Sequence, residues 1–267
     1  MALIEATHAH IYYERYGDGP PVIFAHGAGG NAASWWQQLP YFVERYTVIA
    51  FDHRMFGRSE CAPSDFHGKY FADDLRRILD AEGIDRAALV CQSMGGWTGS
   101  RFALEAPDRV GALVMSHTPG CFTNEEVRAR REEAFRQVDR NTMPPGRFAH
   151  WAVGEQFHET DPRAAFLYTQ ISSLNYRVDR ARLSTLMSDE VLVELETISD
   201  YRTPTLFVTA NGDRIFPPEL IRAVATLVSG AEFDVLGDVG HSSYFESPER
   251  FNARVDQFFA KHWPATH

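Results

Sequence analysis

The chain has 267 residues and a formal net charge of −10, with 44% hydrophobic and 23% charged residues. This length is enough for one large domain or two small ones with a sizeable core. The acidic balance argues against binding DNA, RNA or anionic lipid headgroups, and no apolar run is long enough to span a bilayer. We therefore expect a small-molecule partner, with no nucleic-acid or membrane partner; the oligomeric state, a homo-oligomer included, stays open.

The N-terminal residues lack the basic and then apolar pattern of a signal peptide. The three cysteines are too few and too scattered for a disulfide framework or a zinc site. Both features are typical of a cytoplasmic protein. His8 and His10 could share a strand face as metal ligands, but no third ligand is near them in the sequence. We therefore expect neither a metal nor a cofactor.

Strands and helices alternate along most of the chain. Leu3–Thr7 and His10–Tyr16 alternate in polarity and predict a hairpin. Short, non-alternating apolar runs then predict strands buried on both faces of a parallel sheet: Val22–Ala25, Thr47–Phe51, Ala87–Cys91, Val110–Met115 and Thr205–Thr209. Helical stretches lie between most of them or after the last: Lys69–Glu82, Met94–Glu105, Pro218–Val228 and Pro248–His262. This order predicts an α/β fold with a mostly parallel, doubly wound sheet.

One long interval, between Val110–Met115 and Thr205–Thr209, contains no clear strand. It is helical in character over Asn124–Val138, Pro162–Ser172 and Val178–Met187, and it is rich in aromatic side chains. Connections inside α/β units are usually much shorter. We therefore predict a helical cap at residues 119–200, inserted into a core made of residues 1–118 and 201–267; ordinary crossover helices are the alternative.

The segment Leu89–Gly96 places Ser93 between a predicted buried strand and a helix rich in small residues. A nucleophile elbow requires this context, with small residues two before and two after the serine. Gly95 meets the second condition, and Cys91 stands where the usual pattern has glycine. We predict that Ser93 is a nucleophile with strained backbone angles. A serine that merely caps the helix is the alternative.

A glycine-rich loop, His26–Gly30, follows an earlier buried strand. Its backbone N–H groups can point into the space above the sheet. We predict that the amides of Ala28 and Met94 form an oxyanion hole, in which one donor contributes about 3 kcal/mol of transition-state stabilisation. A plain turn is the alternative. A dinucleotide site fits less well, because the G-x-G-x-x-G spacing is absent.

Two late polar residues complete a candidate triad. Asp213 follows the strand at Thr205–Thr209, and His241 follows a further strand at Ala231–Leu236. Strand ends of an open α/β sheet face one crevice, so both side chains should lie near Ser93. A serine hydroxyl needs a base at neutral pH, and a buried carboxylate fixes the tautomer of the histidine that serves as one.

The acid of this triad has a rival on the same loop as the base. Asp238 lies three residues before His241, and we expect it to brace the loop. An acid can also follow the strand Val110–Met115, but residues 116–119 contain no carboxylate. Asp213 is therefore the predicted acid.

These segments resemble the α/β-hydrolase superfamily, in the lineage of small capped esterases, lactonases and carbon–carbon bond hydrolases. The matching pieces are His26–Gly30, Asp52–Ser59, Cys91–Gly95, Asn211–Asp213 and Gly240–His241. The resemblance implies the hydrolase fold with an inserted cap and a Ser-His-Asp triad. In the second piece Met55 replaces a glycine usual in the family, and Asp52 and Arg54 are expected to brace the loop beside the oxyanion hole.

The substrate is less constrained. A serine nucleophile argues against the dehalogenases and epoxide hydrolases of this fold, which use aspartate. The aromatic residues of the cap predict a small, partly apolar substrate, with Trp151 and Tyr168 as contacts. Trp35 and Trp36 follow the oxyanion loop and are candidates for the same pocket, with Trp35 chosen as a contact and core packing as the alternative for either one. An ester or lactone hydrolase is the favoured function.

Three other functions stay open: a carbon–carbon bond hydrolase, a cofactor-free oxygenase and a ligand receptor on the same fold. Carbon–carbon hydrolases of ring-cleavage products often carry a Gly-Pro-Gly-Ala-like loop and a tryptophan after the catalytic histidine. At those positions this chain has Ala-Gly-Gly-Asn, residues 28–31, and Ser242. The carbon–carbon bond hydrolase is therefore less favoured than the ester or lactone hydrolase.

Overall fold

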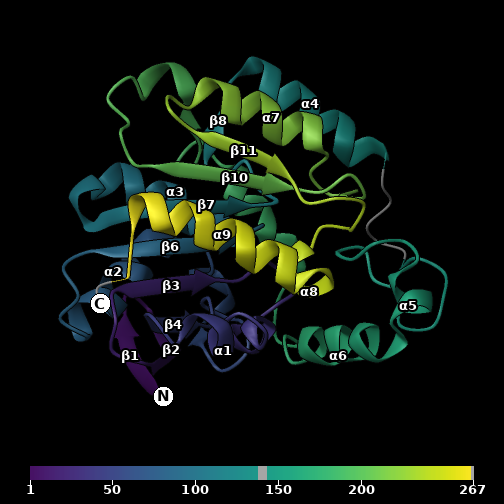
Figure 1. The fold of residues 1–267 in the computed structure, drawn as a ribbon, viewed down its shortest axis with the longest axis horizontal. Helices are drawn as coiled ribbons and strands as arrows, with labels where there is room; N and C mark the ends of the chain where they lie inside the picture. Colours follow the sequence, from purple (N-terminus) through teal and green to yellow (C-terminus); the bar gives the residue numbers. More distant parts are fainter. Residues whose placement is uncertain (138–142, 266–267) are drawn as a thin grey trace.

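The computed structural model describes residues 1–137 and 143–265. Its centre is a nine-stranded sheet in the order β1-β2-β4-β3-β6-β7-β10-β11, with β5 beside β2 (Figure 1). The strands are β1 Ala2–Ala6, β2 Ala9–Tyr16, β3 Pro21–Ala25, β4 Thr47–Phe51, β5 Glu60–Cys61, β6 Ala87–Gln92, β7 Val110–Ser116, β10 Thr205–Thr209 and β11 Glu232–Val235. Neighbours from β4 to β11 are parallel, and β1, β2 and β5 pair antiparallel. The mostly parallel sheet and the N-terminal hairpin are therefore confirmed.

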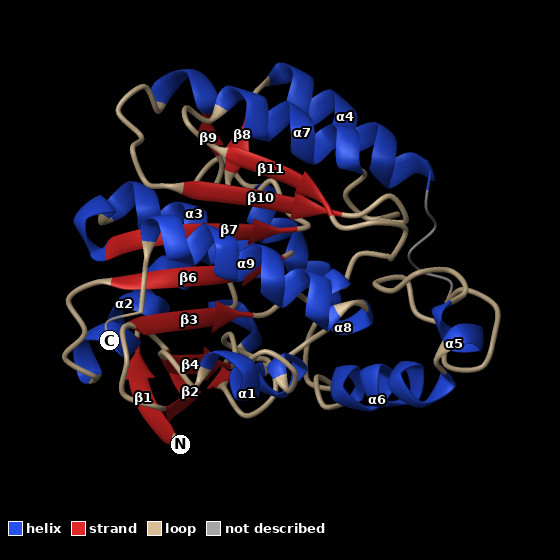
Figure 2. Ribbon diagram, viewed as in Figure 1, coloured by secondary structure: helices blue, strands red, loops and turns tan. Residues whose placement is uncertain are grey.

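Helices cover both faces of this sheet (Figure 2). They are α1 Leu39–Phe42, α2 Phe71–Ala81, α3 Gly95–Glu105, α7 Pro218–Leu227, α8 Ser243–Glu246 and α9 Pro248–His262. In α2 the buried residues Phe71, Leu75 and Ile78 recur at helical spacing, so the helix presents one apolar face to the sheet. Among the described residues, no helix is long and apolar enough to cross a bilayer.

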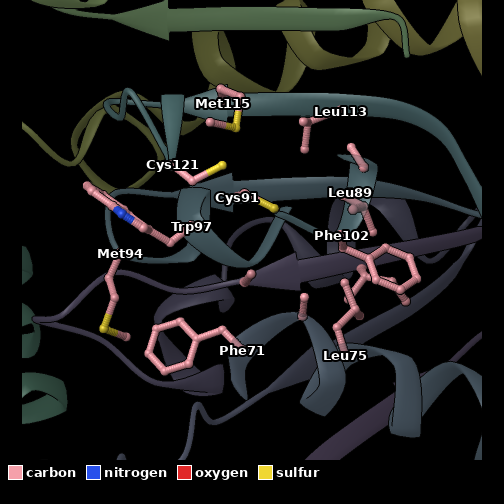
Figure 3. Close-up of a cluster of buried hydrophobic side chains, with 14 of the residues drawn as sticks. Phe71, Leu75, Leu89, Cys91, Met94, Trp97, Phe102, Leu113, Met115 and Cys121 are labelled. Atoms are coloured by element: carbon pink, nitrogen blue, oxygen red, sulfur yellow. The ribbon is translucent and has the colours of Figure 1, made fainter. Parts of the chain in front are cut away.

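The alternation of side chains along each strand divides the interior into two cores. In β3, Ile23 packs with α2 and α3, whereas Phe24 packs with α1 and α9 on the other face. Figure 3 shows part of the first core, where Leu89 and Leu113 of the sheet lie among side chains from α2 and α3. Both faces of the central strands are therefore buried from solvent, which explains why their sequences are apolar without alternation.

The inserted segment 119–200 is divided between two regions of the molecule. It contains β8 Phe122–Thr123, α4 Glu125–Gln137, α5 Phe157–Thr160, α6 Pro162–Ser173 and β9 Val193–Glu194, with β8 and β9 paired. Helix α4 packs beside α7, whereas α5 and α6 lie beyond the carboxyl ends of the strands (Figure 1). The boundaries of the cap stay a prediction.

One predicted helix of the insert has a different form. Val178–Met187 contains a 3-10 helix from Arg180 to Met187, in which only Leu186 is buried. Leu183 and Met187 pack against the core but are only partly buried, so tertiary packing gives little support to a regular α-helix there. The end of the predicted helix Asn124–Val138 lies outside the described residues, because Val138 is not among them.

Candidate active site

Ser93 lies in the sharp turn between β6 and α3. Its φ is +49°, in the left-handed region that side chains rarely adopt, and its backbone N–H donates to the carbonyl of Ser116 at 2.9 Å. A Cβ at position 95 would lie 2.2 Å from the carbonyl oxygen of Ala25, so only glycine fits there. The turn is therefore fixed from both sides, in the strand–turn–helix context that a nucleophile elbow needs.

His241 and Asp213 are hydrogen-bonded in the loops after β11 and β10. The Nδ1 atom of His241 lies 3.0 Å from Oδ1 and 2.9 Å from Oδ2 of Asp213. The carboxylate accepts, so this nitrogen carries the proton. The other ring nitrogen, Nε2, is buried and has no hydrogen-bond partner among the described residues. A neutral His241 therefore has a free acceptor for a proton.

Asp213 is held in place by more than this histidine. Its Oδ1 accepts hydrogen bonds from the backbone N–H groups of Ile215, at 2.8 Å, and Phe216, at 2.9 Å. Burial by itself would raise the pKa of this carboxyl. The neighbouring His241 and the hydrogen bonds of His117 and His241 outweigh burial, and they hold the pKa well below its usual range. Asp213 is therefore charged at neutral pH.

His117 is a second histidine on the same carboxylate, and the sequence analysis did not select it. It follows β7, with a φ of +54°. Its Nδ1 donates to Oδ2 of Asp213 at 2.8 Å, and its Nε2 accepts from the hydroxyl of Ser243 at 2.8 Å. Burial lowers the pKa of His117, so the ring is a neutral donor. The sequence signal for His117 is its position at the carboxyl end of a buried parallel strand, where functional side chains of an open α/β sheet gather.

Replacing His117 with leucine should lower kcat about tenfold and leave KM little changed. The variant removes one donor to Asp213, and a hydrogen bond to a charged group contributes about 1.5–3 kcal/mol. His117→Asn keeps a side-chain donor and should recover part of the loss. Steady-state kinetics on one ester for both variants is the measurement, and an unchanged kcat in His117→Leu would show that the contact has no role in turnover.

His117, Asp213 and His241 form the group, among the described residues, whose ligand atoms lie close enough together to hold a metal ion. Each nitrogen–oxygen contact measures between 2.8 and 3.0 Å, which is the range of hydrogen bonds. We interpret the group as hydrogen-bonded. His8 and His10 belong to no such group.

The glycine-rich loop after β3 is fixed by a buried histidine. The Nδ1 atom of His26 lies 2.7 Å from the carbonyl of Gly27, and its Nε2 accepts from the backbone N–H of His53 at 2.9 Å. None of the hydrogen bonds of the described residues uses the backbone N–H of Ala28 or of Met94. Two free donors therefore lie beside the cavity that Ser93 lines.

The pair His26 and His53 should make the protein sensitive to acid. Burial lowers the pKa of His26 to about 4 and lowers that of His53 well below its usual value. The unfolded chain, with histidine pKa values of about 6.5, binds more protons than the folded chain in this range. The stabilisation is complete above the unfolded pKa and is lost as the pH falls towards the folded one.

Between pH 7.5 and 5.5 each of these histidines should lower the free energy of unfolding by about 1.4 kcal/mol. Urea titrations at both pH values measure the decline. Because other groups also contribute, the sharper readout is His53→Phe, which should reduce the decline by about 1.4 kcal/mol. The exposed His10→Gln is the matched control and should leave it unchanged. An equal decline in all three proteins would contradict the assignment.

A cavity of about 720 Å³ opens between the carboxyl ends of the strands and the inserted segment. Its walls are mostly apolar and include Ser93, His241, Ala28 and Met94, together with Gly29, Gln92, Trp97, Phe135, Met143, His150, Trp151, Ala152, Tyr168, Arg180, Leu183, Ser184, Leu186, Met187, Ile215 and Phe216. The predicted nucleophile, base and oxyanion donors thus share one cavity with Trp151 and Tyr168.

Trp35 does not line this cavity, so its prediction as a substrate contact is wrong. Its ring is fully buried and packs against Phe24, at a centroid distance of 5.2 Å, and Tyr244, at 4.6 Å. The side chain belongs to the core on the α9 face of the sheet. The short 3-10 helix that follows the glycine loop turns Trp35 inward, because Asn31 caps it and fixes its direction.

A family model described as the alpha/beta hydrolase fold matches residues 20–248. The chain belongs to the α/β-hydrolase family. This α/β-hydrolase is 30% identical over 261 residues to a protein of Azorhizobium caulinodans named as a carbamate hydrolase, RutD, and the match covers 91% of this chain and 92% of that protein. It is 27% identical over 265 residues to a protein of Mycobacterium tuberculosis named as a non-heme bromoperoxidase, BpoC, with 94% and 98% covered.

Solved structures share the fold closely. An esterase from Thermogutta terrifontis superimposes with a TM-score of 0.81 at 24% identity, covering 98% of this chain and all of that one. Est816, described as an N-acyl homoserine lactone degrading enzyme, gives 0.77 at 25% identity, with 96% and 100% covered. These proteins are described as acting on different substrates, so family membership assigns the fold and the enzyme class and leaves the substrate open.

One residue of the elbow departs from the usual pattern of the family. Cys91 occupies the usual glycine position of the elbow, and its side chain is buried under α3. A Cβ at Gly99 of α3 would lie 2.5 Å from the Cys91 sulfur. The absence of a side chain at position 99 therefore makes room for the thiol. Burial raises the pKa of Cys91, so this thiol is no rival nucleophile.

Contacts around the two loops also refine the expected braces. Asp238 accepts from the side chain of Asn211 at 2.8 Å and does not contact His241. Glu246 instead holds the histidine loop, accepting from the backbone N–H of Gly240 at 3.1 Å and of Gly154, in the insert, at 2.8 Å. The loop of His241 is therefore tied to the inserted segment through one carboxylate.

Asp52 has the bracing position that the sequence analysis expected. Its Oδ1 accepts from the backbone N–H of Ala32 at 2.6 Å, and its Oδ2 accepts from that of Arg58 at 2.8 Å. Arg54 forms a buried ion pair with Asp74 at 2.6 Å. The contacts of Asp52 join the loop after β4 to the end of the glycine loop, whereas Arg54 joins the same loop to Asp74 of α2.

Proposed function

We propose that this protein is a serine hydrolase that cleaves a small carboxylic ester or lactone through an acyl-enzyme. The observation that carries the proposal is the state of His241. Its Nδ1 is bound to a charged, fully buried carboxylate, and its Nε2 is buried without a partner beside the cavity that Ser93 lines. A buried free acceptor costs stability unless something uses it, and a serine hydroxyl proton is a suitable partner.

The first step forms the acyl-enzyme. The Oγ of Ser93 attacks the substrate carbonyl carbon while Nε2 of His241 takes the hydroxyl proton. Asp213 stabilises the resulting imidazolium through the Nδ1 hydrogen bond. The carbonyl oxygen becomes an anion, and the backbone N–H groups of Ala28 and Met94 donate to it. His241 then gives its proton to the leaving alkoxide, and the carbon–oxygen bond breaks.

The second step returns the enzyme to its first state. A water molecule gives a proton to Nε2 of His241 and attacks the acyl carbon. The same oxyanion donors stabilise the second tetrahedral intermediate. The bond between the acyl carbon and Oγ of Ser93 then breaks, His241 returns its proton to Oγ, and the acid is released. For a lactone the alcohol and the acid are one molecule, because the bond that breaks is part of a ring.

A carbamate is the second candidate substrate, because the relative with 30% identity is named as a carbamate hydrolase. A carbamate presents the same electrophilic carbonyl to Ser93. The test of both candidates is turnover of a panel of p-nitrophenyl esters, lactones, aryl carbamates and ring-fission products by the parent protein and by Ser93→Ala. Ester or lactone turnover that depends on Ser93 supports the proposal. Turnover of ring-fission products alone would favour the carbon–carbon hydrolase.

Trp151 should govern which acyl groups fit. It lies in the insert, lines the cavity, and has the guanidinium of Arg214 4.9 Å from its ring centroid. Trp151→Ala should raise KM about tenfold for medium-length acyl esters, since a large apolar contact is worth about 1.5–3 kcal/mol when fully buried. The control is Trp36→Ala, because Trp36 is 46% exposed and lies outside the cavity. Equal KM values across an acyl-length series would make Trp151 a bystander.

A further inference from the structure

The described lining of the cavity carries a positive charge and no negative one. Arg180 lines it, and none of the described lining residues is acidic. No hydrogen bond or ion pair joins Arg180 to another described residue, whereas its neighbour Arg182 pairs with Asp179 at 3.7 Å. Arg180 is solvent-exposed, so its guanidinium is open to a ligand that enters this mostly apolar cavity, and a cation there attracts an anionic ligand.

His150 adds a directed donor to the same cavity. Its Nδ1 accepts from the backbone N–H of Ala152 at 3.0 Å. Burial, Arg180 and His241 lower its pKa to about 4, so at neutral pH the ring is uncharged and its one proton is on Nε2. No described residue accepts from this Nε2–H. The Nε2–H group of His150 is therefore a donor of fixed direction that is available to a ligand.

The place of His150 relates this donor to the catalytic groups. Its ring packs on Tyr168 at a centroid distance of 5.0 Å, and its Cε1 would lie 3.7 Å from a Cβ at Gly29 in the oxyanion loop. Arg180 and His241 line the same cavity as His150, and both lower its pKa. The ring thus lies within electrostatic range of both the cation and the catalytic base.

We propose that the natural substrate carries a carboxylate, which binds to Arg180 and to the Nε2–H of His150 while the scissile carbonyl lies at Ser93. A guanidinium fork matches the two oxygens of a carboxylate, and one added neutral donor suits a single negative charge. This inference rests on the proposed function for the position of the carbonyl. It narrows the substrate class to esters or lactones of acids that keep a free carboxylate during cleavage.

The test compares pairs of esters with the same chain length, in which one member carries a carboxylate and the other carries an uncharged group at that position. On the acyl side, p-nitrophenyl monoesters of succinate, glutarate and adipate are paired with esters of butyrate, valerate and hexanoate. On the alcohol side, the valerate ester of 4-hydroxybenzoate is paired with that of methyl 4-hydroxybenzoate. The readout is the ratio of kcat/KM for the anionic ester to that for the neutral one, so effects common to both esters cancel.

In at least one of these pairs the ratio should fall about tenfold or more in Arg180→Gln, because a charge-assisted contact is lost. The matched control is Arg182→Gln, on the same 3-10 helix but outside the cavity, and it should leave the ratio unchanged. His150→Leu should also lower the ratio, and His150→Gln, which keeps an N–H donor, should restore part of it. Unchanged ratios in Arg180→Gln for every pair would overturn the proposal.

A binding measurement separates this proposal from the proposed function. Calorimetry with glutarate and the Ser93→Ala protein needs no turnover, and adding Arg180→Gln should weaken binding about tenfold. If no ester is cleaved but glutarate binding depends on Arg180, the hydrolase mechanism fails and the carboxylate site stands. If esters are cleaved through Ser93 and neither the ratio nor glutarate binding responds to Arg180, the mechanism stands and the carboxylate site is wrong.

Discussion

Ser93→Ala is expected to lower kcat by about a millionfold. In a serine hydrolase with a triad, loss of the nucleophile costs about as much as loss of the whole triad, and the remaining activity comes from the oxyanion hole and binding. The half-buried Ser93 lies at the cavity with a left-handed backbone, so alanine removes the hydroxyl at little steric cost. Single-turnover kinetics on the best ester of the panel measures the loss.

A fluorophosphonate probe gives an independent readout of the same residue. It should label the parent protein at Ser93 and leave Ser93→Ala unlabelled. Ser184→Ala is the matched control, because Ser184 lines the same cavity but its hydroxyl donates to the carbonyl of Ala181 at 2.8 Å. Labelling at Ser184, or full turnover in Ser93→Ala, would refute the assignment of the nucleophile.

Asp213→Asn should lower kcat about ten-thousandfold, the cost of this change in the serine-protease template. The asparagine oxygen can still accept from Ile215 and Phe216, so the loop keeps its shape. The amide nitrogen would then replace Oδ2, which lies 2.8 Å from Nδ1 of His117 and 2.9 Å from Nδ1 of His241, and two donors cannot pair there. Oδ1 lies 3.0 Å from Nδ1 of His241 but already accepts from two backbone N–H groups. His241 would turn to the tautomer with its proton on Nε2 and lose its ability to accept from Ser93.

The decisive comparison is with Asp238→Asn, which should keep nearly full activity. Asp238 contacts Asn211 and not the base, so the substitution leaves the hydrogen bonds of His241 intact. Both variants are checked for folding by circular dichroism before kinetics. If Asp238→Asn were the inactive variant and Asp213→Asn the active one, the assigned acid would be wrong, although Ser93 and His241 could still serve as nucleophile and base.

Local sequence patterns were enough to predict the α/β fold and the sites of its sharp turns. Strands buried on both faces must be continuously apolar, so β3, β4, β6, β7 and β10 could be located without any knowledge of their neighbours. The elbow at Ser93 and the loop His26–Gly30 could be located because close backbone approach leaves room only for small residues at a few positions. Each of these constraints acts within about ten residues of chain.

Contacts between distant segments could not be predicted, because they depend on which loops meet at the sheet edge. His117 lies 96 residues from Asp213 in the chain, and nothing near it in the sequence shows that its ring reaches that carboxylate. Trp35 resembles a pocket residue in sequence, and its burial follows from the packing of Phe24 and Tyr244 around it.

The presence of Arg180 and His150 at one cavity was also decided by tertiary structure alone. Arg180 is exposed, as most arginines are, and only the path of the insert over the strand ends brings it to the cavity that Ser93 and His241 line. The sequence by itself determined the fold and a candidate for each catalytic role, because backbone sterics and burial leave local patterns. The tertiary structure decided the charge and shape of the cavity, because these are properties of side chains gathered from segments far apart in the chain.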